Sequence, residues 1–408
     1  MSSGLKAETN SLPPLSQEAL RSKPSAIREI LKLTQQPDII SFAGGLPETN
    51  SLPTQLIPEL HEKAVKDFGQ GIFNYGLTEG FMPFREINKY YLKEQGLVVD
   101  DNLNKVLIHD GSQQTIDLAA RILIDPGDNI VVEGPTYLGA LQAFVPRRPQ
   151  YLQVETDKYG IIPDSLKDIL TKNTIKMLYL VPNFQNPSGN TIPWDRREKI
   201  AELAEKHNFY LFEDDPYGEL RYEGEHVAPI QSLIPNRTIY AHTYSKVLSP
   251  GLRLAAALVP NHMVDKIVEA KQGSDLSAGD YVQALATVYV RDGYLKDHLP
   301  KIRAMYKPRR DTMLNEMVEH FPVNWVYSKP EGGMFIWVQG PEGADTKEIF
   351  KLAVNKKVAF VPGEGFFVSG GTNTMRLNFS FSNEDKISTG IPKLAESIKE
   401  SAVIFENK

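Results

Sequence analysis

The sequence predicts an α/β fold in which a mostly parallel sheet is followed by a second, smaller α/β domain. The middle of the chain alternates short apolar strands with amphipathic helices, and this spacing is typical of a parallel sheet covered by helices on both faces. After about Asp280 the pattern changes to long helices, and strand-like segments return at residues 332–338 and 373–381. We expect these C-terminal segments to form the smaller domain together with the N-terminal segment.

Composition narrows the class of protein. A chain of 408 residues, 41% hydrophobic and 24% charged, is long enough for two or three domains with cores of their own. The net charge of -6 argues against a dedicated nucleic-acid surface. The absence of cysteine excludes a disulfide framework, a thiol nucleophile and a cysteine-ligated metal. No segment has the apolar character of a signal peptide or a membrane span, so we expect a cytoplasmic protein with no metal and no membrane partner.

The N-terminal part is predicted to be a loose arm followed by a helix that begins at about Ser25. Residues 39–47, IISFAGGLP, are predicted to form a short strand that glycine and proline interrupt. The helix is indicated by one apolar face, which consists of Ile27, Ile30, Leu31 and Leu33.

Five strands are predicted in the middle of the chain, and each runs into a polar or glycine-rich turn. They lie in segments 105–114, 128–137, 175–189, 209–218 and 237–246. Two of the intervening helices show an apolar stripe. The first stripe consists of Ile116, Ala119, Ala120 and Leu123, and the second, within residues 195–208, of Ile200, Leu203, Ala204 and His207.

Polar side chains follow every one of these strands. In open α/β sheets, ligands bind in the crevice beyond the carboxyl ends of the strands, so we expect these groups to converge on one cleft. In strand order they are Gly111, Ser112 and Gln113; Tyr137; Asn183 and Asn186; Asp214, Asp215 and Tyr217; and Thr243, Ser245 and Lys246, with Arg253 further on.

This set of groups fits pyridoxal phosphate. A helix that begins just after Gly111 offers backbone N–H groups and a dipole to a phosphate. The cofactor also needs a flat stacking surface, an acid beside its ring nitrogen, donors for its phenolate oxygen and a lysine that bonds it. A lysine loses its proton readily when it is desolvated or lies near other cations, and Arg253 could supply such a charge beside Lys246.

The sequence resembles the class I/II aminotransferases, fold type I of the pyridoxal-phosphate enzymes, and in particular the branch of 2-aminoadipate, kynurenine and broad aromatic aminotransferases. The resemblance spans residues 41–381. It rests on SFAGGLP, FNYGLTEG, HDGSQQ, GPTYLGAL, PNFQNPSG, EDDPYGELRY, YSKVLSPGLR and MRLNFSF, which occur in this order. It implies a large domain with a mostly parallel seven-stranded sheet over residues 51–295. The implied small domain comprises residues 296–408 together with the N-terminal arm and helix at residues 1–50.

The resemblance assigns the reacting groups. Lys246 matches the lysine that bonds the cofactor and moves the substrate proton, although a lysine met alone is most often a surface residue. The Asp-x-x-Tyr spacing selects Asp214 over Asp215 as the partner of the ring nitrogen. Tyr217 and Asn186 match the two donors to the phenolate oxygen. Without the resemblance, an aspartate such as Asp214 would more often be a helix cap, and an asparagine beside proline a turn residue.

The remaining cofactor contacts follow from the same resemblance. Tyr137 matches the aromatic residue that stacks on the ring, and Tyr75 the tyrosine that reaches the phosphate from the partner subunit, which implies an obligatory dimer with shared sites. Without the resemblance, these tyrosines would be interpreted as core or half-buried residues, and the serine and threonine side chains as helix caps. The phosphate cup is matched by Ser112, Gln113, Thr243, Ser245 and Arg253.

Substrate binding is assigned to a second set of residues. Arg376 matches the arginine whose planar fork grips the α-carboxylate, and Gly45 would let its backbone approach the same group. Asn186 and Tyr75 would also border the substrate. Arg28 on the N-terminal helix would favour an acidic side chain such as that of 2-aminoadipate; the competing interpretation is a solvated residue paired with a neighbour such as Glu29.

The activity implied is transamination by a ping-pong mechanism between an L-amino acid and 2-oxoglutarate. Two alternatives share the cofactor cage: another fold type I enzyme, such as a β-lyase or decarboxylase, and a ligand-sensing regulator built on this fold. The regulator is disfavoured because few residues precede the first shared segment. A nicotinamide dehydrogenase is disfavoured because GEGFFV, which begins at Gly363, lacks the third glycine of the dinucleotide motif.

Overall fold

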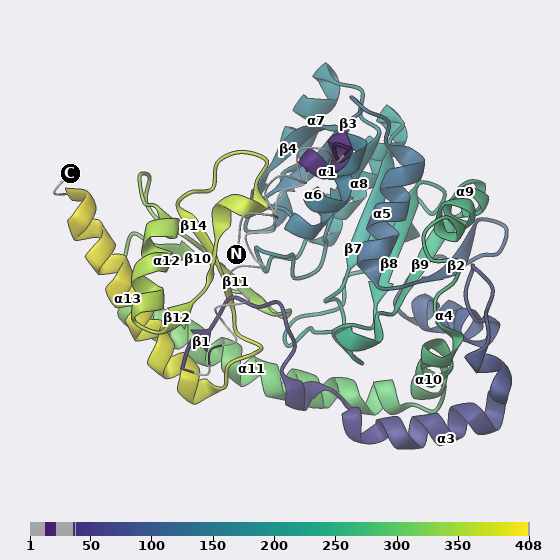
Figure 1. Ribbon diagram of the computed structural model, residues 1–408. Helices are drawn as coiled ribbons and strands as arrows, with labels where there is room; N and C mark the ends of the chain where they lie inside the picture. Colours follow the sequence, from purple (N-terminus) through teal and green to yellow (C-terminus); the bar gives the residue numbers. More distant parts are fainter. Residues whose placement is uncertain (1–12, 22–35, 37, 407–408) are drawn as a thin grey trace, which may run out of the picture.

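The large sheet lies in the right-hand part of Figure 1, beside the smaller sheet on the left. The computed structural model describes residues 13–21, 36 and 38–406, and the predicted helix from Ser25 lies outside the described residues. Eight strands form the sheet in the order β2-β9-β8-β7-β6-β3-β4-β5. Their bounds are β2 Asn104–His109, β3 Asn129–Gly134, β4 Gln150–Asp157, β5 Gly160–Ile161, β6 Met177–Leu180, β7 Tyr210–Asp215, β8 Thr238–Thr243 and β9 Ala255–Pro260.

The prediction of a mostly parallel sheet is confirmed, and the strand count differs by one. Strands β8, β7, β6, β3 and β4 are parallel neighbours, whereas β9 runs against both β8 and β2. The eighth strand, β5, arises because the chain turns back on β4 at Gly160, whose φ of 77° suits glycine. Because β5 has only two residues, it leaves no periodic signal in the sequence.

Helices cover both faces of this sheet, and their apolar stripes explain where they pack. On one face, α5 (Ser112–Leu123) buries Ile116, Ala119 and Ala120 against the strands. On the other face lie α7 (Pro163–Lys172) and α8 (Trp194–His207). Successive strand residues therefore alternate between two cores, with Leu178 and Leu211 in one and Tyr179 and Phe212 in the other.

The C-terminal part forms a smaller antiparallel sheet of order β10-β11-β14-β13, and α12 (Thr346–Asn355) and α13 (Glu384–Glu406) belong to the same part of the chain. The strands are β10 Val326–Tyr327, β11 Phe335–Gln339, β13 Val361–Pro362 and β14 Thr374–Asn378. The N-terminal strand β1 (Ile40–Ser41) pairs in parallel with β12 (Val358–Ala359). The N-terminal segment is thus joined to the C-terminal part; the domain borders at residues 50 and 295 stay predictions.

Long helices connect the two parts. Helix α11 (Tyr294–His320) runs from α10 (Asp280–Arg291), beside the large sheet, towards α13 at the small one (Figure 1). In the stretches of chain described above, no helix is both long and apolar enough to cross a membrane. The arrangement leaves the carboxyl ends of β6, β7 and β8 facing the small sheet, which places the site between them.

Candidate active site

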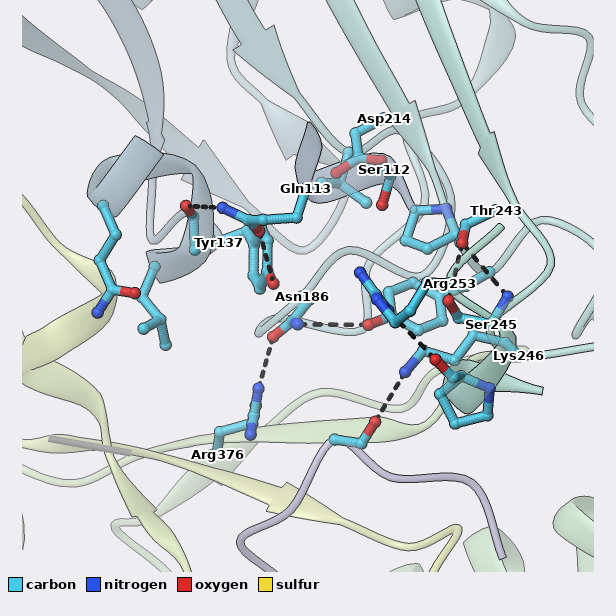
Figure 2. A pocket seen from close by; sticks show the side chains of 18 residues that line it. Ser112, Gln113, Tyr137, Asn186, Asp214, Thr243, Ser245, Lys246, Arg253 and Arg376 are labelled. Carbon is cyan, nitrogen blue, oxygen red and sulfur yellow. Dashed lines mark hydrogen bonds between the residues drawn. The ribbon is translucent and has the colours of Figure 1, made fainter. Parts of the chain in front are cut away.

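A cavity of about 350 Å³ lies at the carboxyl ends of the large-sheet strands and is closed from below by the small sheet (Figure 2). Among the described residues, it contains every residue that the resemblance assigned to the site except Tyr75. Those residues are Gly45, Ser112, Gln113, Tyr137, Asn186, Asp214, Tyr217, Thr243, Ser245, Lys246, Arg253 and Arg376. The sequence analysis did not anticipate the remaining lining residues, which are Leu138, Gly139, Gln142, Val181, Pro216 and Pro250.

Lys246 follows β8 and projects its amine across the cavity. Nζ donates a hydrogen bond to the carbonyl oxygen of Gly45 at 2.8 Å. Burial, together with the positive charges of Arg376 and Arg253, lowers the pKa of Lys246 to about 8. A substantial fraction of the amine is therefore unprotonated near neutral pH and able to act as a nucleophile or a base.

Asp214 ends β7 with one carboxylate oxygen engaged and the other free. Oδ2 accepts a hydrogen bond from the Tyr179 hydroxyl at 2.8 Å, whereas Oδ1 is buried and has no hydrogen-bond partner in the described part of the chain. Burial raises the pKa of Asp214 to about 7. A buried acceptor that lines a cavity without a donor is suited to a ligand that brings an N–H group.

The choice of Asp214 over Asp215 is matched by how the two side chains are placed. Asp215 points away from the cavity and accepts hydrogen bonds from Asn183 at 2.8 Å and Tyr240 at 3.0 Å. Asn183, which the sequence analysis placed in the same cleft, therefore lies outside it. Successive residues of a strand point to opposite faces, so only one of two adjacent carboxylates can line the site.

A chain of hydrogen bonds joins the small sheet to the large one. Arg376 on β14 donates through Nη1 to Asn186 Oδ1 at 2.8 Å, and Asn186 Nδ2 donates to the Tyr217 hydroxyl at 3.3 Å (Figure 2). The guanidinium lies over the rings of Phe335, 4.2 Å from its centroid, and Phe366, at 5.1 Å.

The hydrogen bonds and burial of the Arg376 guanidinium suit it to binding an anion. Its other amino group donates to the carbonyl oxygen of Ala43 at 2.8 Å, and its Nε is buried without a partner among the described residues. Burial lowers the pKa of Arg376 to about 10. A buried guanidinium whose protein partners are neutral gains most from a ligand carboxylate, which it can bind with two parallel hydrogen bonds.

The opposite end of the cavity offers hydroxyls, an arginine and the N-terminus of α5. Thr243 Oγ1 donates to Ser245 Oγ at 3.0 Å, and Arg253 reaches across to the carbonyl oxygen of Asp110 at 3.3 Å. Gly111 begins the turn before α5 with φ 82°, and a Cβ there would lie 2.4 Å from Arg253 Nη2. The close approach of backbone, guanidinium and hydroxyls is suited to a phosphate.

Gln113 and Tyr137 are tied to each other and to α6 (Leu138–Phe144). Gln113 Nε2 donates to the carbonyl oxygen of Gly139 at 2.7 Å, and the Tyr137 hydroxyl lies 3.4 Å from Gln113 Oε1. Burial raises the pKa of Tyr137, so its phenol stays protonated at neutral pH. The ring of Tyr137 is thereby fixed as one wall of the cavity.

One described residue that the resemblance assigned to the site, Tyr75, does not line this cavity. Tyr75 is 86% exposed on the loop after the 3-10 helix η4 (Gln70–Phe73). Arg28 lies outside the described residues. The most prominent residue that sequence reasoning missed is Tyr179: its position in MLYL reads as an ordinary core strand, and only the pairing of β6 with β7 brings it to Asp214.

The groups present fit pyridoxal phosphate. The cavity combines an amine of lowered pKa, a buried carboxylate oxygen without a donor, two donors next to each other in Asn186 and Tyr217, and a phosphate-type cup. A metal would need a cluster of carboxylates or histidines, and Asp214 is the only such side chain that lines the cavity among the described residues.

Comparison with known proteins agrees with this chemistry. Residues 37–393 match the family described as aminotransferase class I and II. The chain is 44% identical to aromatic-amino-acid aminotransferase 1 of Thermococcus litoralis over 94% of each chain. It is 35% identical to 2-aminoadipate transaminase of Thermus thermophilus over 93% of this chain and 95% of the relative.

A solved structure shares the whole fold. The kynurenine aminotransferase of Pyrococcus horikoshii, crystallised in complex with PMP, superimposes with a TM-score of 0.91 at 44% identity, over 95% of this chain and 97% of the other. Family, relatives and fold therefore agree with the contents of the cavity. The chain belongs to the class I and II aminotransferases, in the branch of aromatic-amino-acid, 2-aminoadipate and kynurenine aminotransferases, and is a transaminase that uses pyridoxal phosphate.

Proposed function

We propose that this cavity transfers the amino group of an L-amino acid to 2-oxoglutarate in two half-reactions of a ping-pong mechanism. The observation that carries the proposal is the placement of Lys246, Asp214 and Arg376 around one cavity. An amine of lowered pKa, a partner for a ring nitrogen and a grip for a carboxylate are the three groups that the reaction requires.

Each reacting residue has a role that its position supports. Pyridoxal phosphate, when bound, supplies an electron sink that lets an amino acid lose its Cα proton. Lys246 would hold the cofactor covalently through Nζ and, once released, take up that proton and return it. Asp214 would keep a proton on the ring nitrogen through Oδ1. Tyr217 and Asn186 would donate to the phenolate oxygen.

Residues at the two ends of the cavity would bind and orient the cofactor and the substrate. The phosphate would be held by the N-terminus of α5 with Ser112, Thr243, Ser245 and Arg253, and Gln113 would fix Tyr137 against the ring. Arg376 would bind the α-carboxylate of either substrate. Its bond to Asn186 gives that interaction a direct connection to the phenolate donors.

We further propose that Tyr75 completes the site of a second copy, so that the active form is a homodimer. Tyr75 lies in a segment that exposes several large apolar side chains, and exposed apolar surface is typical of protein–protein contacts. Exposure is 58% for Phe73, 86% for Tyr75, 57% for Leu77 and 50% for Met82. The cytoplasmic location expected from the sequence is kept as part of this proposal.

The described walls of the cavity favour donors with aromatic or long neutral side chains. Arg376 and Arg253 are the only arginines among the described lining residues, and both have other roles. Beyond them, Tyr137, Leu138 and Gln142 offer ring, methyl and amide surfaces. Acidic donors such as 2-aminoadipate would depend on Arg28.

The test is the visible spectrum of the purified protein loaded with pyridoxal phosphate. Kynurenine, phenylalanine, leucine, glutamate and 2-aminoadipate are added separately. We expect a yellow band that bleaches with the true donors and returns on addition of 2-oxoglutarate. Bleaching by acidic donors that Arg28→Ala abolishes would support the role of Arg28. A band that no amino acid bleaches would contradict the proposed donors, and a protein that stays colourless would contradict the site.

A further inference from the structure

We propose that Tyr179 is the positioning residue for Asp214: its hydroxyl fixes the carboxylate so that the second oxygen meets the ring nitrogen of pyridoxal phosphate. The inference rests on the role proposed above for Asp214. It adds Tyr179, which lies on the neighbouring strand β6 and does not itself line the cavity.

Sheet register brings the two side chains together. Strands β6 and β7 are parallel, and Tyr179 is paired with Phe212. Asp214 lies two residues further along β7 on the same face, within reach of a long side chain from the neighbouring strand. The Tyr179 hydroxyl accordingly donates to Asp214 Oδ2 at 2.8 Å.

The phenol is held so that it cannot easily turn elsewhere. Tyr179 is fully buried, and its ring packs edge-on against Phe144 and tilted against Phe212, with centroid separations of 5.8 and 5.6 Å. Burial and the nearby charge of Asp214 raise the pKa of Tyr179 well above its usual range. The hydroxyl therefore remains a donor at any working pH.

Because Oδ2 is engaged by Tyr179, Oδ1 is the oxygen left for a ligand. A carboxylate rotates freely about its last bond unless its oxygens are held. The hydrogen bond from Tyr179 also favours the ionised carboxylate, against the effect of burial. The other titratable groups that interact electrostatically with this pair are Tyr137, Tyr217, Glu133 and, from the opposite face of β7, Asp215.

The experiment measures the affinity of the cofactor-free protein for two ligands. One is pyridoxal 5′-phosphate, and the other is its 1-deaza analogue, in which a C–H group replaces the ring nitrogen. The wild-type protein is expected to prefer pyridoxal phosphate, and Asp214→Asn to lose that preference. Tyr179→Phe should reduce the preference roughly tenfold, as expected for the loss of a hydrogen bond to a charged group, and leave the affinity for the analogue within about twofold of wild type.

Tyr240→Phe is the matched control. Tyr240 is also buried and lies on β8, the other neighbour of β7. Its hydroxyl donates to Asp215, the carboxylate next to Asp214 that lies outside the cavity. This variant loses a similar bond and should keep the wild-type preference. Tyr179→Met is measured in parallel, because its flexible side chain refills the space without a donor.

Each outcome separates the two proposals. No preference in the wild-type protein would overturn the role of Asp214 itself. A preference that Asp214→Asn abolishes and Tyr179→Phe leaves intact would overturn the role of Tyr179 alone. An equal loss of affinity for both ligands in the Tyr179 variants would assign Tyr179 to packing and also overturn the inference.

Discussion

The amine of Lys246 sets a pH dependence for cofactor uptake. Since its pKa lies at about 8, the ammonium form dominates below that value and the nucleophilic amine above it. We expect the rate at which visible absorbance develops, after mixing the cofactor-free protein with pyridoxal phosphate, to rise with pH with a midpoint near 8. Stopped-flow absorbance gives this profile. A midpoint near 10.5, the value of an ordinary lysine, would contradict it, and Lys246→Ala should develop no band.

Asp214 makes the cofactor-free protein less stable than it could be. Its pKa is about 7 in the folded chain and 3.8 in the unfolded chain, so the folded state binds more protons between these values and stability falls as pH rises through this window. The difference corresponds to roughly 4 kcal/mol at pH 8. We expect Asp214→Asn to raise the urea midpoint of the cofactor-free protein at pH 8 and to lose this advantage towards pH 4. A gain that does not change with pH would contradict the explanation.

Many individual residues of the candidate site could be predicted from the sequence. Lys246, Asp214 and Arg376 stand in segments whose residue order is distinctive, so the resemblance located them. Tyr179 could not be found in this way, because its role depends on which residue of β7 it faces. Asn183 was placed wrongly because both asparagines follow the same strand, and the sequence does not show that Asn186 lines the cavity whereas Asn183 binds Asp215.

Among the elements, the turn between β2 and α5 is the most constrained. We expect Gly111→Ala to weaken pyridoxal phosphate binding by tenfold or more, because the new Cβ would lie 2.4 Å from Arg253 Nη2 and the residue would keep a φ of 82°. The left-handed backbone alone costs about 1–2 kcal/mol of stability. Equilibrium dialysis of the cofactor measures the first effect and thermal unfolding the second.

Gly127→Ala is the matched control for that turn. Gly127 has φ 92°, and a Cβ there would meet nothing within 4 Å. It should share the loss of stability and keep the cofactor affinity. If both variants lose affinity to the same degree, the cup does not depend on the approach of Arg253 to Gly111.

Elements with strong periodicity were predictable, and those made by pairing were not. Helices α5 and α8 bury most of the stripes expected from their apolar spacing, whereas Leu123, Leu203 and His207 are only partly buried. Strand β4 was missed because most of its residues are only partly buried, so its hydrophobic pattern is weak. Strands β12 and β13 have two residues each and exist only through their partners, whereas β1 (Ile40–Ser41) lies within the short strand predicted over residues 39–47.

For the whole molecule, the proposed dimer makes a strict prediction. Lys246→Ala and Tyr75→Ala chains should each be inactive or nearly so, and co-expression should restore about a quarter of the activity, since hybrid dimers contain one site with both residues intact. The measurement is transamination by the co-expressed mixture, and hybrid dimers separated from it should show about half of the wild-type activity. Full activity of Tyr75→Ala alone would remove Tyr75 from the site. No recovery in the hybrids would place Tyr75 in its own subunit's site.

The association of the N-terminal segment with the C-terminal part was predicted only in general terms. The sequence indicated that the N-terminal and C-terminal parts belong together, and the parallel pairing of Ile40 with Val358 joins them. The cavity depends on this union, because Gly45 follows β1 and Arg376 lies on β14. Hydrophobic periodicity reports on neighbours along the chain, so it could not give this register.

The pairing of β1 with β12 also dictates the order in which a nascent chain can be completed. The ribosome makes Ile40 early, but its partner Val358 emerges only after most of the chain has been translated. Loop closure over such a distance is entropically slow, and the waiting strand exposes an unpaired edge. Translation that stops before residue 358 would yield a product with Lys246 and the phosphate cup but without Arg376. Such a fragment is expected to need chaperones, and the arginine that we propose to bind the substrate carboxylate joins the site only late in translation.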